Sequence, residues 1–298
     1  MVKIGSLCSG YGGLDLAAEA HFNAQTVWFS EIDKHASQVF SNHFNVPNLG
    51  NLKDIDWEKV EPIDILTAGY PCQPFSHAGS RKGLDDERHI FPNILQGISV
   101  LRPRIVILEN VRGHLSLGFK EVLEGLTSIG YDAKWQVVRA SEVGAPHQRA
   151  RLFIVAYPTS LGLTCGNTGG LEAAESCSTN NGLTTNTDCV TCKESRRTCA
   201  CIHGEASEVI NRTDRQKYRF SVEMDRQTIP NTLDKDNKLN PKFVEYMMGL
   251  PEGWVTDQGL SRANQLKMLG NGVVPQQAKY ALEILWDKSH NIVSQIVR

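Results

Sequence analysis

The stretch Gly69-Tyr70-Pro71-Cys72-Gln73-Pro74-Phe75-Ser76 decides how the rest of this chain is interpreted. It follows an apolar run from Ile63 to Ala68, which predicts a buried strand of a parallel sheet. Gly69 and Pro71 end that strand and turn the chain into a loop at the strand's carboxyl end. Because ligands bind at that edge of open α/β sheets, we expect Cys72 on a ligand-facing loop. A lone cysteine is more often a small buried hydrophobic residue, so its role depends on its surroundings.

Length, charge and cysteine content limit the class of protein. A chain of 298 residues can bury a large core, as one domain with an insertion or as two domains. The net charge of −2 means that any contact with nucleic acid must come from a local basic patch. No apolar run approaches the roughly 18 residues of a membrane span, and the amino terminus enters a strand without a signal peptide. Eight cysteines then indicate reduced thiols in the cytoplasm.

Two segments near the amino terminus have the pattern of a nucleotide-binding unit. A short strand leads into the turn Gly10-Tyr11-Gly12-Gly13, followed by a helical pattern from Leu14 to His21. The turn does not match the dinucleotide spacing G-x-G-x-x-G, and alone it is weak evidence. The next strand, Thr26 to Ser30, ends at Glu31, where a carboxylate can accept hydrogen bonds from ribose hydroxyls. The alternative is a solvated carboxylate, or the start of the helix that runs to His43.

Two later segments place charged side chains beside predicted strands. The strand Arg104 to Leu108 ends at Glu109-Asn110-Val111, and a carboxyl group there is costly unless it has a partner or a function. Capping of the next helix is the alternative. The segment Pro146 to Arg151 carries Arg149 and Arg151 just before the strand Leu152 to Ala156. We expect these two arginines, two residues apart at the start of that strand, to point to opposite faces, so that only one faces a ligand if the strand has already begun. Structural salt bridges are the alternative.

Together, these segments resemble the motifs of the cytosine-5 DNA methyltransferases, in the order of that family. The loop at Cys72 is similar to the family's Pro-Cys-Gln loop, and Glu109-Asn110-Val111 matches its Glu-Asn-Val motif. The arginine segment resembles Pro-Gln-x-Arg-x-Arg, with His147 in place of glutamine. The resemblance implies an α/β fold: a Rossmann-like, S-adenosylmethionine-dependent methyltransferase domain with a mostly parallel sheet and helices on both faces. A smaller, irregular target-recognition domain is expected across a cleft.

The resemblance also implies a set of site residues. The catalytic set is Cys72, which attacks a flipped-out cytosine, Glu109, which contacts its ring nitrogen 3, and Arg149 and Arg151, one of which orients the ring. The set expected to bind S-adenosylmethionine is Cys8, Gly10, Tyr11, Gly12, Gly13, Glu31, Ile32, Asp54, Ile55, Asn271 and Val273. Cys8 stands where the family usually has phenylalanine. No metal is expected in this site.

The middle of the chain changes composition and is expected to differ in structure. We predict a catalytic and cofactor-binding domain from residues 1–156 and 262–298, and a target-recognition domain from 157–261. Within the latter, Cys189-x-x-Cys192 and Cys199-x-Cys201-x-His203 resemble a small zinc site, with reduced loop thiols as the favoured alternative. The run Arg212 to Arg219 could contact phosphates or form a solvated face. Helices are expected after Pro241 and from Gln276 to Asp287.

The sequence therefore predicts an enzyme that methylates carbon 5 of cytosine in a specific double-stranded DNA sequence, using S-adenosylmethionine. We expect a cytoplasmic monomer without membrane contact, and a restriction endonuclease acting on the same site is a candidate partner. Two alternatives stay open: a transfer-RNA cytosine-5 methyltransferase, and a catalytically silent DNA-binding relative. An amino-group methyltransferase is disfavoured, because it needs an Asp-Pro-Pro-Tyr-like loop where this chain has Pro-Cys-Gln.

Overall fold

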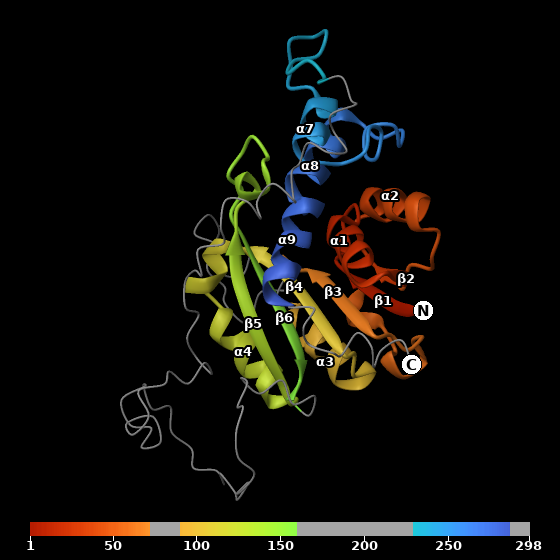
Figure 1. Ribbon diagram of the computed structural model, residues 1–298. Helices are drawn as coiled ribbons and strands as arrows, with labels where there is room; N and C mark the ends of the chain where they lie inside the picture. The colour runs from red at the N-terminus through yellow and green to blue at the C-terminus, as the bar shows by residue number, and fades with distance from the viewer. Residues whose placement is uncertain (72–89, 160–228, 287–298) are drawn as a thin grey trace, which may run out of the picture. The chain divides into compact units, whose positions relative to one another are not determined.

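A computed structural model describes residues 1–71, 90–159 and 229–286 of the protein (Figure 1). The strands of the described part form one sheet in the order β2-β1-β3-β4-β6-β5. The first four in that order run parallel, whereas β6 is antiparallel to both β4 and β5. The strands are β1 (Val2–Leu7), β2 (Ala24–Ser30), β3 (Ile65–Gly69), β4 (Ile105–Val111), β5 (Tyr131–Val138) and β6 (Arg151–Pro158). The expected Rossmann-like α/β fold with a mostly parallel sheet is confirmed.

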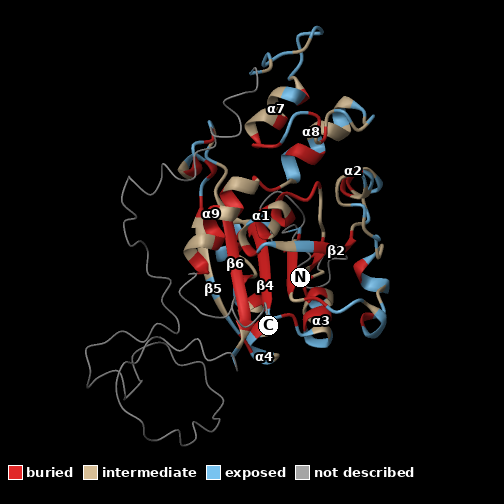
Figure 2. Cartoon of the chain, turned by 45° about the vertical axis from the view of Figure 1, so that its right-hand side comes forward, coloured by how far each residue is buried: buried red, intermediate tan, exposed pale blue. Residues whose placement is uncertain are grey.

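Helices cover both faces of this sheet (Figures 1 and 2). The described helices are α1 (Gly13–Phe22), α2 (Lys34–Phe44), α3 (Phe91–Leu101), α4 (Phe119–Ser128), α7 (Pro241–Met247), α8 (Arg262–Asn271) and α9 (Pro275–Leu285). On one face α1 packs against α9, and on the other α3 packs against α4. No helix in these three described ranges has the length and apolar character of a membrane span.

The core lies between the sheet and these helices, and the sequence of the central strands accounts for it. Residues Ile105 to Leu108 of β4 are fully buried on both faces of the strand, as the continuous apolar run predicts (Figure 2). One apolar cluster joins alternate residues of β3, β4 and β6 to the apolar faces of α3 and α4. A second cluster joins α2 to α8 and to the segment after α7. The sheet is therefore a rigid base from which loops at its carboxyl edge project.

The beginning and the end of the described chain pack together. An added Cβ at Gly13, the first residue of α1, would lie 2.1 Å from the carbonyl oxygen of Val273, so only glycine allows this approach. Trp254 Nε1 donates to the carbonyl of Tyr11 at 2.9 Å, and the Trp254 ring stacks on His43 with a centroid separation of 3.6 Å. The segment after α7 is thereby attached to α1 and α2.

A buried carboxylate shapes the turn that follows α7. Glu245 is 1% exposed, and its side chain accepts hydrogen bonds from the backbone N–H groups of Gly253, Val255 and Thr256 at 2.6–2.9 Å. Three backbone donors satisfy a charge that would otherwise be costly to bury. This arrangement folds residues 245–256 into a closed turn against the second apolar cluster.

The chain divides into two compact units, residues 1–161 with 209–298, and residues 162–208. The second unit lies entirely outside the described residues. So do the Cys189–His203 cluster and the basic run Arg212–Arg219, whose predicted roles remain predictions. The target-recognition domain predicted at 157–261 also stays a prediction.

Candidate active site

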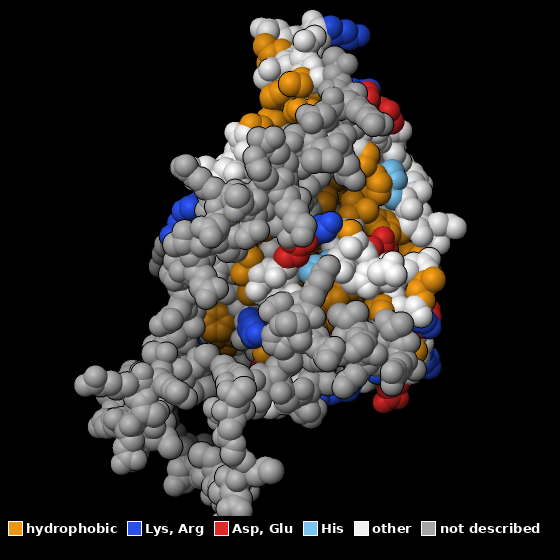
Figure 3. All heavy atoms as spheres, in the orientation of Figure 1, with side chains coloured by type: hydrophobic (Ala, Val, Ile, Leu, Met, Phe, Trp, Pro, Cys, Tyr) orange, Lys and Arg blue, Asp and Glu red, His pale blue; other side chains and the backbone are white. Residues whose placement is uncertain are grey.

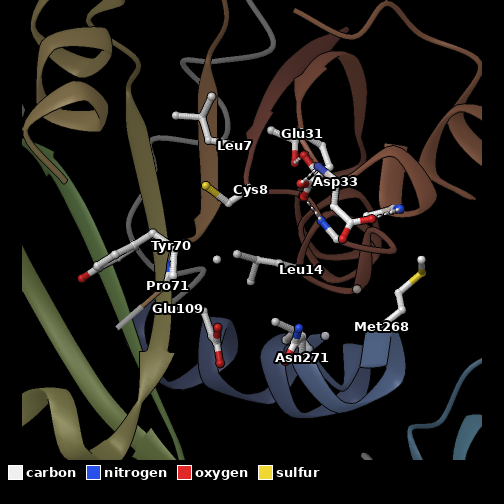
Figure 4. A pocket seen from close by; sticks show the side chains of 18 of the residues that line it. Leu7, Cys8, Leu14, Glu31, Asp33, Tyr70, Pro71, Glu109, Met268 and Asn271 are labelled. Carbon is white, nitrogen blue, oxygen red and sulfur yellow. Dashed lines mark hydrogen bonds between the residues drawn. The ribbon is translucent and has the colours of Figure 1, made fainter. Parts of the chain in front are cut away.

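A cavity of about 650 Å³ opens at the carboxyl ends of the parallel strands (Figure 4). One wall, which we call the sheet wall, comes from the segments that follow β1, β2 and β3 and from the end of β4. The opposite wall, which we call the C-terminal wall, consists of α8 and the turn at residues 270–273. In the space-filling view, acidic, basic and histidine side chains lie close together near the centre of the visible face (Figure 3). The cavity is at the edge where the sequence predicts ligand binding.

The glycine turn after β1 contributes the backbone of Cys8 and Gly10 to the sheet wall. Both have a left-handed backbone, with φ of +51° and +56°. An added Cβ at Gly10 would meet no atom within 4 Å, so this stretch of backbone is open to whatever fills the cavity. The Cys8 side chain also lines the cavity, and burial, followed by the charge of Glu31, raises the pKa of its thiol to about 12.

Two residues of the same turn do not line the cavity. Tyr11 is fully buried, and its hydroxyl donates to the carbonyl of Val273 at 2.7 Å. Gly12 faces away, because an added Cβ there would lie 2.4 Å from the ring of Phe44. The structure therefore places both in the packing beneath the turn, whereas Gly13 does line the cavity.

The segment after β2 carries an acidic and an apolar side chain on the cavity. Glu31 accepts hydrogen bonds from the backbone N–H of Gly10 at 3.0 Å and from that of Asp33 at 2.9 Å. Each carboxylate oxygen keeps further acceptor capacity. Ile32 lines the cavity while 76% exposed, which is unusual for an apolar side chain and offers a surface for a flat ring. Asp33 caps α2 by accepting from the backbone N–H of His35 at 3.0 Å.

Asp54 and Ile55 lie beside the cavity lining rather than on it. Asp54 accepts from the Asn51 side chain at 2.9 Å, and Ile55 packs on the apolar cluster under the sheet. Their neighbours Asn51 and Lys53 do reach the cavity. The segment at residues 51–55 therefore does reach the cavity, but through Asn51 and Lys53 and not through the predicted Asp54 and Ile55.

A buried ion pair forms the polar end of the cavity. Glu109 Oε1 lies 3.0 Å from Arg151 Nε, and the two side chains are only 9% and 17% exposed. Burial raises the pKa of Glu109 to about 7, while the charge of Arg151 opposes that rise. Since β4 continues to Val111, Glu109 lies within the strand and not after it as expected. A carboxyl group with this pKa can be present in its neutral form near neutral pH.

Arg149 does not line the cavity, unlike Arg151. Its Nη2 donates to the carbonyls of Gly270 and Gly272 at 2.7 and 2.6 Å, so it holds the turn of the C-terminal wall. The two arginines do point apart as expected, but strand alternation is not the reason, because residues two apart share a face. The cause is the backbone: Arg149 precedes β6 and has a φ of +36°.

Cys72 and the rest of its loop to residue 89 lie outside the described residues. The two residues before it, Tyr70 and Pro71, do line the cavity. The Asn110 side chain donates to the carbonyl of Tyr70 at 3.2 Å, which fixes the chain as it leaves β3. In the sequence, Cys72 is therefore the next residue after a described segment that lines the cavity.

The sequence predicted fewer of the cavity residues in the C-terminal wall than in the sheet wall. Asn271 and Val273 line the cavity as predicted, but so do residues of α8 that it missed, namely Asn264, Lys267 and Met268. Lys267 Nζ lies 2.8 Å from Asp33 Oδ2 and joins the two walls. The hydrogen bond from Lys267 is the main reason that the pKa of Asp33 is lowered. A signal that could have found α8 is Ser261, whose side chain caps the helix.

Asp15 in the first turn of α1 was also missed. It is 1% exposed, lines the cavity, and accepts from the Thr67 hydroxyl at 2.6 Å. Burial raises its pKa to about 6. An acidic residue in the first turn of a helix is so common that the sequence alone does not mark it.

The fold is a Rossmann-like α/β domain of the methyltransferase type, and its cavity has an acidic end at Glu31 and Asp33 and a carboxyl–guanidinium end at Glu109 and Arg151. Comparison with known proteins is specific: the family described as C-5 cytosine-specific DNA methylase matches residues 2–181. The chain belongs to this family.

Individual relatives match about half of the chain. Type II methyltransferase M.Bsp6I of Bacillus sp. is 38% identical over 165 residues, which cover 53% of this chain and 52% of that protein. Type II methyltransferase M.NgoBI of Neisseria gonorrhoeae is 36% identical over 166 residues, covering 54% and 52%. The chain thus spans about half the length of these curated relatives.

Solved structures share the fold along nearly the whole chain. The methyltransferase EhMeth of Entamoeba histolytica superposes with a TM-score of 0.62 at 20% identity, covering 97% of this chain and 99% of that one. A putative DNA modification methyltransferase encoded within an Escherichia coli prophage gives a TM-score of 0.61 at 18% identity, with 100% of both chains covered. At these identities the likeness establishes the fold alone.

Proposed function

We propose that this protein transfers a methyl group from S-adenosylmethionine to carbon 5 of a cytosine flipped out of double-stranded DNA, through a transient bond to Cys72. The observation that carries the proposal is the shared cavity. The Glu109–Arg151 pair and the acidic segment at Glu31 face one space of about 650 Å³, in a chain of the cytosine-specific methylase family.

The described residues fit S-adenosylmethionine at one end of this cavity. Gly10 leaves room for close approach of a ligand to the backbone, Glu31 retains acceptor capacity for ribose hydroxyls, and Ile32 offers an apolar surface for a base. Asn271 and Val273 border the same space from the C-terminal wall. When bound, the cofactor supplies a methyl group on a positively charged sulfur.

The other end of the cavity suits the cytosine. Neutral Glu109 donates a hydrogen bond to ring nitrogen 3, where negative charge gathers when a nucleophile adds to the ring. Arg151, already beside Glu109, has donors left for the ring carbonyl oxygen and so fixes the base. The target must leave the DNA stack to reach this space, because the ring face is inaccessible inside a duplex.

Cys72 supplies the nucleophile in this proposal. Its thiolate adds to carbon 6, and the new S–C bond makes carbon 5 electron-rich enough to accept the methyl group. A water or hydroxide then removes the proton from carbon 5, the S–C bond breaks, and the electron pair returns to sulfur. Asn110 holds the carbonyl of Tyr70, two residues before Cys72, and thereby supports the start of this loop.

We also propose the remaining features that the family resemblance implies. The target-recognition domain falls within residues 157–261, and the protein acts as a cytoplasmic monomer. A restriction endonuclease that acts on the same DNA site is its candidate partner. Support for the last point comes from relatives that are named type II methyltransferases.

The test is methyl transfer from labelled S-adenosylmethionine to duplex DNA and to transfer RNA, side by side, followed by bisulfite sequencing of the DNA. We expect label in duplex DNA at one cytosine of a fixed sequence, and none with Cys72→Ala. Label in transfer RNA alone would identify the RNA-directed alternative. No label in either substrate would favour a catalytically silent relative.

A further inference from the structure

We propose that Tyr70 and His114 form a buried hydrogen-bonded pair that positions the chain as it enters the cysteine loop, which makes His114 a positioning residue for the reaction. The Tyr70 hydroxyl lies 2.9 Å from His114 Nε2. This inference rests on the proposed function, since positioning matters only if Cys72 acts as the nucleophile.

The pair joins the extensions of two neighbouring strands. Tyr70 directly follows β3, and His114 lies in the 3₁₀ helix of residues 112–116 that directly follows β4. The two strands are already paired up to Gly69 and Glu109. Beyond that point the regular ladder stops, and two side-chain hydrogen bonds continue the connection: Tyr70 with His114, and Asn110 with the Tyr70 carbonyl.

The hydroxyl, the backbone carbonyl and the ring of Tyr70 are thereby all held by neighbouring residues. Its ring runs away from the cavity in Figure 4, packing at 5.7 Å from the ring of Phe91 and edge-on to His114 at 5.6 Å between centroids. Phe119 packs edge-on to the His114 ring, with a centroid separation of 6.4 Å. Only Pro71, whose φ is fixed by its own ring, separates this anchored residue from Cys72 in the sequence.

The polar character of the pair is what calls for an explanation. Tyr70 is 5% exposed and His114 is 3% exposed, and burying a phenol and an imidazole costs free energy unless both are hydrogen-bonded. Two apolar side chains would fill the same space without that cost. A hydrogen bond adds direction, which fixes the rotation of the Tyr70 ring, whereas apolar packing alone only fills volume. Burial lowers the pKa of His114, which favours the neutral ring.

The test compares Tyr70→Phe, His114→Leu and His114→Gln with the unchanged protein. The rate measured is that of covalent complex formation with duplex DNA containing 5-fluorocytosine, beside the Kd for S-adenosylmethionine and the melting temperature. Tyr131→Phe is the matched control. The buried Tyr131 hydroxyl donates to the Pro103 carbonyl at 2.7 Å, two residues before β4 begins. This hydrogen bond lies at the opposite end of β4 from Glu109. The control substitution removes an equivalent hydrogen bond without touching the cavity.

We expect Tyr70→Phe and His114→Leu to slow complex formation at least about tenfold, since small displacements of a reacting group cost that much or more. The Kd should stay within about twofold. His114→Gln should restore most of the rate, because an amide can still bond the hydroxyl. Tyr131→Phe should lower the melting temperature but not the rate. If His114→Leu does not fold, Tyr70→Phe alone carries the test.

Two outcomes would overturn the inference alone: an unchanged rate in Tyr70→Phe, or a loss of rate matched by an equal loss of cofactor affinity. If the unchanged protein forms no covalent complex with this DNA, the proposed function fails and the inference falls with it.

Discussion

The two walls of the cavity differ in origin and in what they do. The sheet wall follows the ends of neighbouring parallel strands and carries the Glu109–Arg151 pair, in which both partners are mostly buried. The C-terminal wall comes from chain more than 100 residues further on, and it is held by hydrogen bonds from Arg149 and by the Lys267–Asp33 pair. The buried pair thus lies on strands of the sheet, whereas the second wall is a separate element fixed in place by a few polar contacts.

This difference predicts two kinds of mutant. Changes to the Glu109–Arg151 pair of the sheet wall should lower kcat and leave cofactor binding nearly intact. Changes in the C-terminal wall should weaken cofactor binding with a smaller effect on kcat.

The largest effect should come from Glu109. Glu109→Ala removes both the donor to the base and the partner of Arg151, so we expect kcat to fall by about 10²–10⁴. Glu109→Gln keeps a hydrogen-bonding group and should retain more activity than alanine. Steady-state kinetics with duplex DNA measures both, with the Kd for the cofactor as control. A kcat within about threefold of the original in Glu109→Ala would remove Glu109 from the mechanism.

Arg149 and Arg151 give the sharpest comparison of the two walls, because they are only two residues apart in the sequence but contact different walls. Arg151→Lys keeps the charge but loses the fork of donors, and we expect kcat to fall about 10²-fold. Arg149→Lys loses two hydrogen bonds to the 270–272 turn, and we expect the Kd for S-adenosylmethionine to rise about tenfold with a smaller change in kcat. Isothermal titration and kinetics on both variants check this. Equal effects of the two on kcat and Kd would contradict the division between walls.

The acidity of Glu109 gives the sheet wall a pH dependence. With a pKa near 7, the neutral form is lost as the pH rises through that value, so kcat should decline on the alkaline side. The charge of Arg151 lowers this pKa, so replacing it in Arg151→Gln should raise the pKa and move the decline to higher pH. A pH profile of kcat for both proteins measures the shift. A shift toward lower pH in the variant would show that another group controls the decline.

The smallest effect should come from the rim. Lys267→Met breaks the pair with Asp33, whose side chains are 63% and 37% exposed, and we expect the cofactor Kd to rise only about twofold. The difference in cofactor Kd between Lys267→Met and the original protein should disappear at high salt, because salt screens the pair in the original protein. Lys120→Met on α4 breaks a pair of similar exposure away from the cavity and is the control. A tenfold loss in Lys267→Met would mean that Lys267 contacts the cofactor itself.

The same contrast explains what the sequence could and could not predict. The sheet wall follows from local patterns: the β-branched run before Glu109 predicts β4, and the apolar periodicity between Phe91 and Leu101 predicts α3 with the bounds it has. These patterns arise because buried strands and helix faces must be apolar. The cavity position follows as well, because the carboxyl ends of parallel strands share one edge.

Other elements differ in this respect. The alternation of apolar and polar residues from Tyr131 to Val138 marks β5, and the spacing of Phe119, Val122 and Leu126 marks α4, so both could have been predicted from the sequence. α8 faces the cavity and solvent more than the core, so few of its side chains are buried and its amphipathic pattern is weak. The role of Arg149 was also beyond the sequence, because the positive φ that turns its side chain away from the cavity depends on tertiary contacts.

The most direct test of the central claim is to identify which sulfur bonds to the base. The protein is reacted with S-adenosylmethionine and duplex DNA containing 5-fluorocytosine, digested, and analysed by mass spectrometry. Cys8 competes with Cys72 in this test because it lines the described cavity, although burial raises the pKa of its thiol to about 12. The account predicts a methylated fluorocytosine adduct on Cys72 and an unmodified Cys8. An adduct on Cys8, or none on any cysteine, would contradict it.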